Sequence, residues 1–156
     1  IKYIKEFFPN RTVNLEIVGG GTEYNNLKNM CKSTEINARF YGWINNKRKL
    51  REIYLNASCF CLTSINEGFP NVVLEAMSYG LPIISTKVGA LPFWLEEDKN
   101  ILFSQIGDSY GLAKNINRIF NDRNLYNEIS KNNIKDINNK FNCANISKEL
   151  KNFILD

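Results

Sequence analysis

Two glutamates, Glu67 and Glu75, stand with seven residues between them, on either side of a turn that leads into a helix. Pro70 suits the first position of that helix, where its missing N–H costs nothing. The backbone N–H groups of residues 71–73 are then expected to be free, because the first amides of a helix have no intrahelical acceptor. A helix terminus of this kind attracts anions and is suited to a diphosphate.

The two carboxylates restrict what such an anion site can hold, because a carboxylate repels a phosphate unless it has neutral hydroxyls to bind. Glu75 lies four residues after Asn71, on the same helix face, where it could accept both vicinal hydroxyls of a ribose. Glu67 precedes the turn and could reach a second group beyond the phosphates. A nucleotide with a polyhydroxylated group at each end is a sugar nucleotide, and this is the ligand that the pattern predicts.

The elements that must position these residues alternate between short apolar runs and amphipathic helices. This alternation predicts one α/β domain over residues 1–156, with a Rossmann-like parallel sheet of about five strands, helices on both faces and a helical portion over 108–156. Strands are expected at 13–18, 37–41, 58–63, 82–86 and 100–103. Helices are expected at 22–33, with Thr22 as the N-cap, and at 46–56, 70–79, 91–95 and from 108 onwards, with breaks near Asp122 and Asn142.

Ligands of such sheets bind outside the carboxyl ends of the strands, here the loops at 19–21, 42–45, 64–70 and 87–90. A dinucleotide interpretation of the first loop fails, because Gly19-x-Gly21-x-x-Tyr24 lacks the third glycine and no acid follows the strand at 37–41. A tight turn is the simpler interpretation of these glycines. Two alternatives to a sugar-nucleotide enzyme stay open: an NAD-binding oxidoreductase domain and a non-catalytic carbohydrate-binding or partner-binding module.

Composition excludes several other functions. The chain has no histidine, which removes Ser-His and Cys-His nucleophiles and the commonest zinc ligand. Its four cysteines form no CxxC pair and are interpreted as buried, reduced thiols; Cys59 and Cys61 share one strand face. A formal net charge of +4, spread along the chain, gives little support to nucleic-acid binding. No apolar run approaches the roughly 20 residues that span a bilayer.

The segment EGFPNVVLEAMSYGLPIIST, with its EX7E motif of Glu67 and Glu75, resembles the signature of retaining glycosyltransferases with two facing Rossmann-like domains, the GT-B fold, especially family 4. The resemblance extends to LEIVGGGTEYNNL, FYGWI, YLNASCFCLTS, SYGLPIISTKVGALP and the helix at 107–120, in order and over about four-fifths of the chain. It implies the nucleotide-sugar-binding carboxyl-terminal domain of such an enzyme.

The resemblance implies a role for each matching residue. Glu75 would hold the ribose and Glu67, the catalytic residue, would contact the donor sugar, helped by backbone groups of Gly68 and Phe69. The amides of Asn71 and Val72 would hold the diphosphate. Trp43 could equally cover the core or lie with Ile44 beside the nucleobase. The full implied donor site comprises Gly21, Trp43, Ile44, Ser64, Glu67, Gly68, Phe69, Pro70, Asn71, Val72 and Glu75, for a UDP- or GDP-sugar and without a metal.

The resemblance also concerns what would lie outside this sequence. Ile1 follows no initiator methionine and falls inside a helical pattern, so we expect a fragment of a two-domain enzyme. The family's Arg/Lys-bearing first strand and its acceptor-binding amino-terminal domain would precede Ile1, and the fragment alone is expected to be inactive. The expected reaction transfers a hexose-type sugar to a glycan or lipid-linked acceptor in bacterial surface polysaccharide synthesis. The expected location is the cytoplasm, with peripheral contact at the inner face of the membrane.

Overall fold

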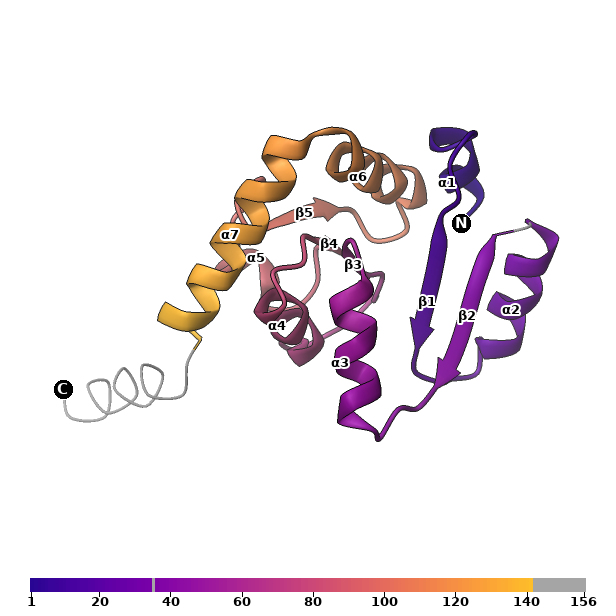
Figure 1. Cartoon of the computed structure of the whole chain (residues 1–156), viewed down its shortest axis with the longest axis horizontal. Coiled ribbons are helices and arrows are strands. Elements are labelled where there is room, and N and C mark those ends of the chain that lie inside the picture. Colours follow the sequence, from indigo (N-terminus) through magenta and orange to yellow (C-terminus); the bar gives the residue numbers. More distant parts are fainter. Residues whose placement is uncertain (35, 142–156) are drawn as a thin grey trace. The chain divides into compact units, whose positions relative to one another are not determined.

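The computed structural model describes residues 1–34 and 36–141, in two compact units, Ile1–Asn56 and Ala57–Asp156. Figure 1 shows the helices and strands of both units. None of the helices in the described part of the chain is long and apolar enough to cross a membrane.

The first unit pairs two parallel strands. The register runs from Asn14 opposite Asn37 to Ile17 opposite Phe40, and an irregularity follows Ile17. Side chains alternate between exposed and half-buried along the first strand, as expected for a strand with one covered face. The elements are α1 (Lys2–Phe7), β1 (Asn14–Val18), α2 (Tyr24–Ser33), β2 (Asn37–Gly42) and α3 (Lys47–Asn56).

The second unit contains a three-stranded parallel sheet with the order β3-β4-β5. The middle strand is buried at every position, including its polar residues Ser85 and Thr86, as expected for a strand covered on both faces. The elements are β3 (Phe60–Leu62), α4 (Asn71–Ser78), β4 (Ile83–Thr86), α5 (Leu91–Trp94), β5 (Ile101–Ser104), α6 (Ser109–Asn121) and α7 (Arg123–Asn139). Helix α4 packs on β3, β4 and α7, while α6 packs on β4 and β5.

A core cluster joins this sheet to its last two helices. Ile84 of β4 and Leu102 of β5 pack with Ile119 of α6 and Ile129 of α7, and all four are buried. Burial of four such side chains contributes about 1.5–3 kcal/mol each to folding. These contacts hold the strands rigid, and the carboxyl ends of the strands carry the candidate site.

A buried polar cluster fixes α7 against the rest of the second unit. The Asn133 side chain donates to the Leu81 carbonyl at 2.9 Å, and its oxygen accepts from Asn100 Nδ2 at 3.3 Å. The same Asn100 nitrogen donates to Asp136 Oδ2 at 3.1 Å. Because each buried amide has partners in this cluster, the cluster sets the position of α7 along its axis.

The outer edge of β5 is closed by side chains and backbone of its own unit. The Phe103 N–H donates to Glu97 Oε1 at 2.9 Å, and the Phe103 carbonyl accepts from Asn115 Nδ2 at 2.9 Å. The Ile101 carbonyl accepts the Asp98 N–H at 3.0 Å. Polar groups that an edge strand usually leaves open are therefore occupied here.

The α/β class, the parallel pairing and the helices on both sides are confirmed. In residues 1–34 and 36–141 the predicted strands pair as one sheet of two and one of three, not as a single sheet. The prediction that Thr22 caps a helix is wrong: Glu23 occupies the N-cap of α2, without a side-chain bond. Asp122 separates α6 from α7 as expected, and its carboxylate accepts the Leu125 N–H. The expected break near Asn142 and the end of the helical portion lie outside the described residues. The single-domain interpretation of 1–156 stays a prediction.

Candidate functional site

The loop between β3 and α4 carries Glu67 and is fixed to the segment that follows β4. The Thr86 hydroxyl donates to the Ser64 carbonyl at 2.6 Å, where the loop leaves β3. Near the other end, the Ala90 N–H donates to the Gly68 carbonyl at 2.9 Å. Both bonds lie at the carboxyl edge of the sheet. They fix the two segments to each other at the place where ligands of such sheets bind.

Gly89 allows this close approach of the two loops. Its φ is +54°, in the left-handed region that favours glycine. A Cβ at this position would lie 2.5 Å from the Glu67 carbonyl oxygen and 2.9 Å from the Gly68 carbonyl carbon, and closer still to the Gly68 oxygen. Any larger residue would therefore have to push the Glu67 loop away.

The Glu67 carboxylate is oriented by a neighbour on its own loop. The Ser64 hydroxyl donates to Glu67 Oε1 at 2.6 Å, and both side chains are half-buried. A short bond to a charged acceptor is stronger than a neutral one and restricts the rotamers of the glutamate. Ser64 therefore holds Glu67 in place, while the second carboxylate oxygen is not used by this bond.

The first turn of α4 differs by one residue from the prediction. Pro70 is the N-cap and Asn71 is the first helical residue. The Val73 N–H bonds to the Pro70 carbonyl at 2.9 Å, so the expectation of a free Val73 amide is wrong. The backbone amides of Asn71 and Val72 have no hydrogen-bond acceptor among residues 1–34 and 36–141, and both residues are exposed. Two donors, rather than three, are available for an anion.

Glu75 lies one turn further along α4, on its outer side. Val73, Ala76 and Met77 form the buried face of this helix, while Asn71 and Glu75 are exposed. The structure thus brings Ser64, Glu67, Gly68, Phe69, Pro70, Asn71, Val72 and Glu75 together on one loop and one helix. The two amides at the turn can bind an anion. The carboxylates before and after the turn can then bind a hydroxyl-bearing group on each side of that anion.

Three predicted site residues lie in the other unit, after its strands. Gly21 follows β1, and Trp43 and Ile44 follow β2; the two loops are tied by a Gly19 N–H bond to the Gly42 carbonyl at 2.8 Å. Trp43 is 86% exposed, which contradicts its alternative interpretation as a cover of the core. The contribution of these three residues to the donor site stays a prediction.

The cysteines follow their predicted pattern only in part. Cys31 is buried, but Cys61 is exposed, which contradicts burial of all four thiols; Cys143 lies outside the described residues. Cys59 directly precedes β3 and Cys61 lies within it, and their thiols are hydrogen-bonded, as expected for residues two apart on one side of an extended chain. This bond lowers the pKa of Cys59 and raises the pKa of Cys61.

Sequence reasoning missed the residues that position the loop. The predicted site does not include Thr86, Gly89 or Ala90. Thr86 bonds to Ser64 and Ala90 bonds to Gly68, and Gly89 allows the close approach. One signal was present: a glycine three residues after a buried strand, at the ligand edge of the sheet, indicates close approach of another backbone.

Known glycosyltransferases resemble this chain in sequence and in fold. The family described as "Glycosyl transferases group 1" matches residues 1–136. An uncharacterized glycosyltransferase of Haemophilus influenzae is 32% identical over 118 residues, which are 75% of this chain and 33% of the relative. The lipopolysaccharide core biosynthesis glycosyltransferase LpsE of Rhizobium meliloti is 30% identical over 115 residues, 72% of this chain and 33% of LpsE.

A solved structure shows the same fold. HepE of Anabaena, in complex with UDP, superposes with a TM-score of 0.77 at 22% identity, over 91% of this chain and 40% of HepE. The α/β architecture is that of the carboxyl-terminal domains of GT-B glycosyltransferases. The chain spans about a third of the length of the two curated relatives. It belongs to the family of glycosyl transferases group 1.

Proposed function

We propose that this chain is the donor-binding domain of a retaining, family 4-like glycosyltransferase. Its ligand would be a nucleoside-diphosphate sugar, with UDP or GDP as the nucleotide and a hexose-type sugar. Membership of the family supports the reaction class, and the UDP bound to HepE, a protein of the same fold, supports the type of ligand.

The observation that carries the proposal is the fixed loop that leads into α4. Ser64 orients Glu67 through its 2.6 Å bond. The amides of Asn71 and Val72, which bond to no acceptor in the part of the chain that the structure describes, follow within the same turn. In the proposed complex these amides donate hydrogen bonds to the diphosphate, Glu75 binds the ribose hydroxyls, and Glu67 binds hydroxyls of the donor sugar.

The proposed chemistry breaks the bond between the anomeric carbon and the β-phosphate oxygen. Negative charge grows on that oxygen as the bond breaks, and fixed amide donors stabilise it without reorganising. Glu67 holds the sugar so that the acceptor hydroxyl reaches the anomeric carbon on the face that retains its configuration. Part of the work of a cation would thus be done by the helix terminus, and we expect no metal requirement.

Calorimetry with the 156-residue chain tests this proposal. We expect binding of UDP or GDP, unchanged by EDTA, and no binding of NAD. Loss of nucleotide binding in EDTA would contradict the metal-free site. Binding of NAD without UDP or GDP would favour the oxidoreductase alternative, and binding of free sugars alone would favour a carbohydrate-binding module.

The proposal for the whole protein extends beyond this chain. The acceptor would be a glycan or a lipid-linked saccharide in surface polysaccharide assembly, which the named role of LpsE supports. An amino-terminal domain would bind the acceptor, with the enzyme in the cytoplasm at the inner face of the membrane. We expect no sugar transfer by residues 1–156 alone, as measured by release of UDP in the presence of acceptor. Transfer by this chain alone would refute the division of the active site between two domains.

A further inference from the structure

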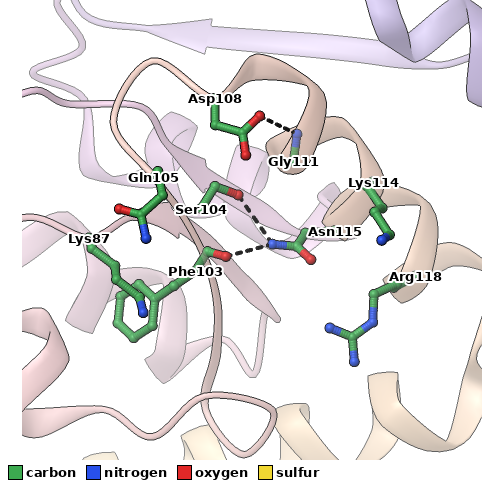
Figure 2. Close-up of a pocket in the computed structure, with 9 residues that line it drawn as sticks. All are labelled: Lys87, Phe103, Ser104, Gln105, Asp108, Gly111, Lys114, Asn115 and Arg118. Carbon is green, nitrogen blue, oxygen red and sulfur yellow. Dashed lines mark hydrogen bonds between the residues drawn. The ribbon is translucent and has the colours of Figure 1, made fainter.

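A cavity of about 380 Å³ lies in the second unit, beside the proposed donor site but lined by other residues. It lies where β4 and β5 end, against the first turns of α6, and Figure 2 shows the residues around it. None of the residues of the Glu67 loop or of α4 lines this cavity. It therefore needs an explanation of its own.

Three cations from two different segments surround this cavity. Lys87 follows β4, while Lys114 and Arg118 lie one turn apart on α6 and share a helix face (Figure 2). Arg118 donates to Asp98 at 2.8 Å with one of its nitrogens. Neither lysine has a carboxylate within 4.0 Å among the described residues of the chain. Lys87 instead lies over the Phe103 ring, 5.8 Å from its centre.

One carboxylate also lines the cavity, and it is engaged with its own helix. Asp108 is the N-cap of α6, and its Oδ1 accepts the Gly111 N–H at 2.8 Å. A Cβ on Gly111 would lie 2.8 Å from the Asp108 carboxyl carbon, so the glycine lets the carboxylate fold against the first turn. The positive end of the helix dipole offsets the charge of this carboxylate. When the Asp98 carboxylate that pairs with Arg118 is counted with Asp108, three cations face two carboxylates, and the cavity keeps an excess of one positive charge.

The inner wall of the cavity is polar and fixed. Asn115 is 9% exposed and Ser104 is 5% exposed. The Asn115 amide nitrogen donates to the Phe103 carbonyl at 2.9 Å and to the Ser104 hydroxyl oxygen at 3.2 Å. The Ser104 hydroxyl therefore acts as an acceptor toward Asn115, and its own hydrogen remains available for a ligand. A buried hydroxyl donor surrounded by cations suits an acceptor-rich anion.

We propose that this cavity binds a phosphate group carried by an organic molecule, at a site separate from the donor diphosphate. A phosphomonoester supplies acceptor oxygens for Lys87, Lys114, Arg118 and the Ser104 hydroxyl, and the volume leaves room for the attached group. The inference does not depend on the proposed donor site, since the two share no lining residue.

The test uses the ¹⁵N-labelled 156-residue chain, titrated with glucose 1-phosphate, inorganic phosphate or glucose. Amide shifts are expected at Ser104, Gly111 and Lys114 with both phosphates and not with glucose. Tighter binding of glucose 1-phosphate identifies an organic phosphate as the ligand, whereas equal or tighter binding of inorganic phosphate overturns that part of the proposal. Binding should weaken as NaCl is added, because exposed charges are screened.

The variant Lys87→Gln/Lys114→Gln should weaken glucose 1-phosphate binding about tenfold or more, since it removes two charged donors. The matched control is Lys131→Gln/Lys135→Gln on α7, which removes the same charge from exposed positions outside the cavity. Equal loss in both variants would mean non-specific attraction and would overturn the proposal. Shifts centred on Asn71 and Val72, or displacement of the phosphate by UDP, would also overturn it by placing the anion in the donor site. A chain that binds glucose 1-phosphate but no nucleotide would contradict only the proposed function.

Discussion

Replacing Gly89 with alanine tests whether the contact between the two loops sets the position of Glu67. The new Cβ would lie 2.5 Å from the Glu67 carbonyl oxygen and 2.9 Å from the Gly68 carbonyl carbon, where an ordinary contact needs about 3.4 Å or more. The obstacle is backbone, which cannot move aside as a flexible side chain can. The loop must shift by roughly an ångström, and the Ala90 bond to Gly68 is lost or stretched.

The expected cost has two parts. A non-glycine residue in the left-handed region costs about 1–2 kcal/mol. Loss of the hydrogen bond between Ala90 and Gly68 adds about 1 kcal/mol. Gly89→Ala should therefore lower the free energy of unfolding by about 2–3 kcal/mol, measured by urea denaturation followed by circular dichroism. Because the loop carrying Glu67 moves, UDP affinity measured by calorimetry should fall about tenfold.

Gly107→Ala is the matched control for this prediction. Gly107 has φ of +83°, in the same region as Gly89, but a Cβ there meets no atom within 4 Å. The control should lose only the backbone cost of about 1–2 kcal/mol and should bind UDP normally. If both variants lose the same stability and both keep their UDP affinity, the contact between the loops does not position Glu67.

Three further predictions concern single side chains. Glu75→Gln should weaken UDP or GDP binding by about 1–3 kcal/mol in calorimetry, because the ribose loses a charged acceptor. The control Glu128→Gln, on the exposed surface of α7, should have no effect on binding. An unchanged dissociation constant for Glu75→Gln would remove Glu75 from the site. Asn133→Leu should lower the free energy of unfolding by about 2–4 kcal/mol, because it leaves the buried Leu81 carbonyl without its donor. A loss below about 0.5 kcal/mol in urea denaturation would show that the buried cluster does not hold α7. Asp122→Ala should cost about 1 kcal/mol, since it removes the side-chain cap of α7, and unchanged thermal unfolding would speak against that cap.

The order of the elements could be predicted because its signals are local. Each apolar run bounded by glycine or a polar turn became a strand, and Asp122 separated two helices as its capping chemistry predicts. Glu67 and Glu75 could be predicted to lie on one loop and the helix that follows it, and their joint role in one donor site stays a prediction. Their positions follow from their spacing along the chain and need no knowledge of distant contacts.

The start of α4 shows where local reasoning reached its limit. Proline is compatible with both the N-cap and the first helical position, because its fixed φ suits either. The structure selects the N-cap, with ψ of 104°, and the Pro70 carbonyl then takes the Val73 amide. This bond spans three residues rather than the four of an α-helix, and it lowers the number of available donors from three to two.

The contact between Gly89 and Gly68 could not be predicted from sequence pattern. It joins residues twenty-one positions apart, and it depends on how the segment after β4 folds back over the end of β3. The cavity beside α6 has the same origin, since Lys87 and Lys114 are brought together only by the packing of α6 on β4 and β5.

The occupied outer edge of β5 affects how copies of this chain associate in concentrated solution. The Phe103 amide is bonded to Glu97 and its carbonyl to Asn115, while the Ile101 carbonyl is bonded to Asp98. A strand from another molecule therefore finds few free backbone groups on this edge with which to pair. Fibre growth by strand addition is thereby discouraged on that flank. Glu97 and Asn115 thus protect this edge from pairing with other strands. A variant that loses both side chains should precipitate at lower protein concentration than the parent.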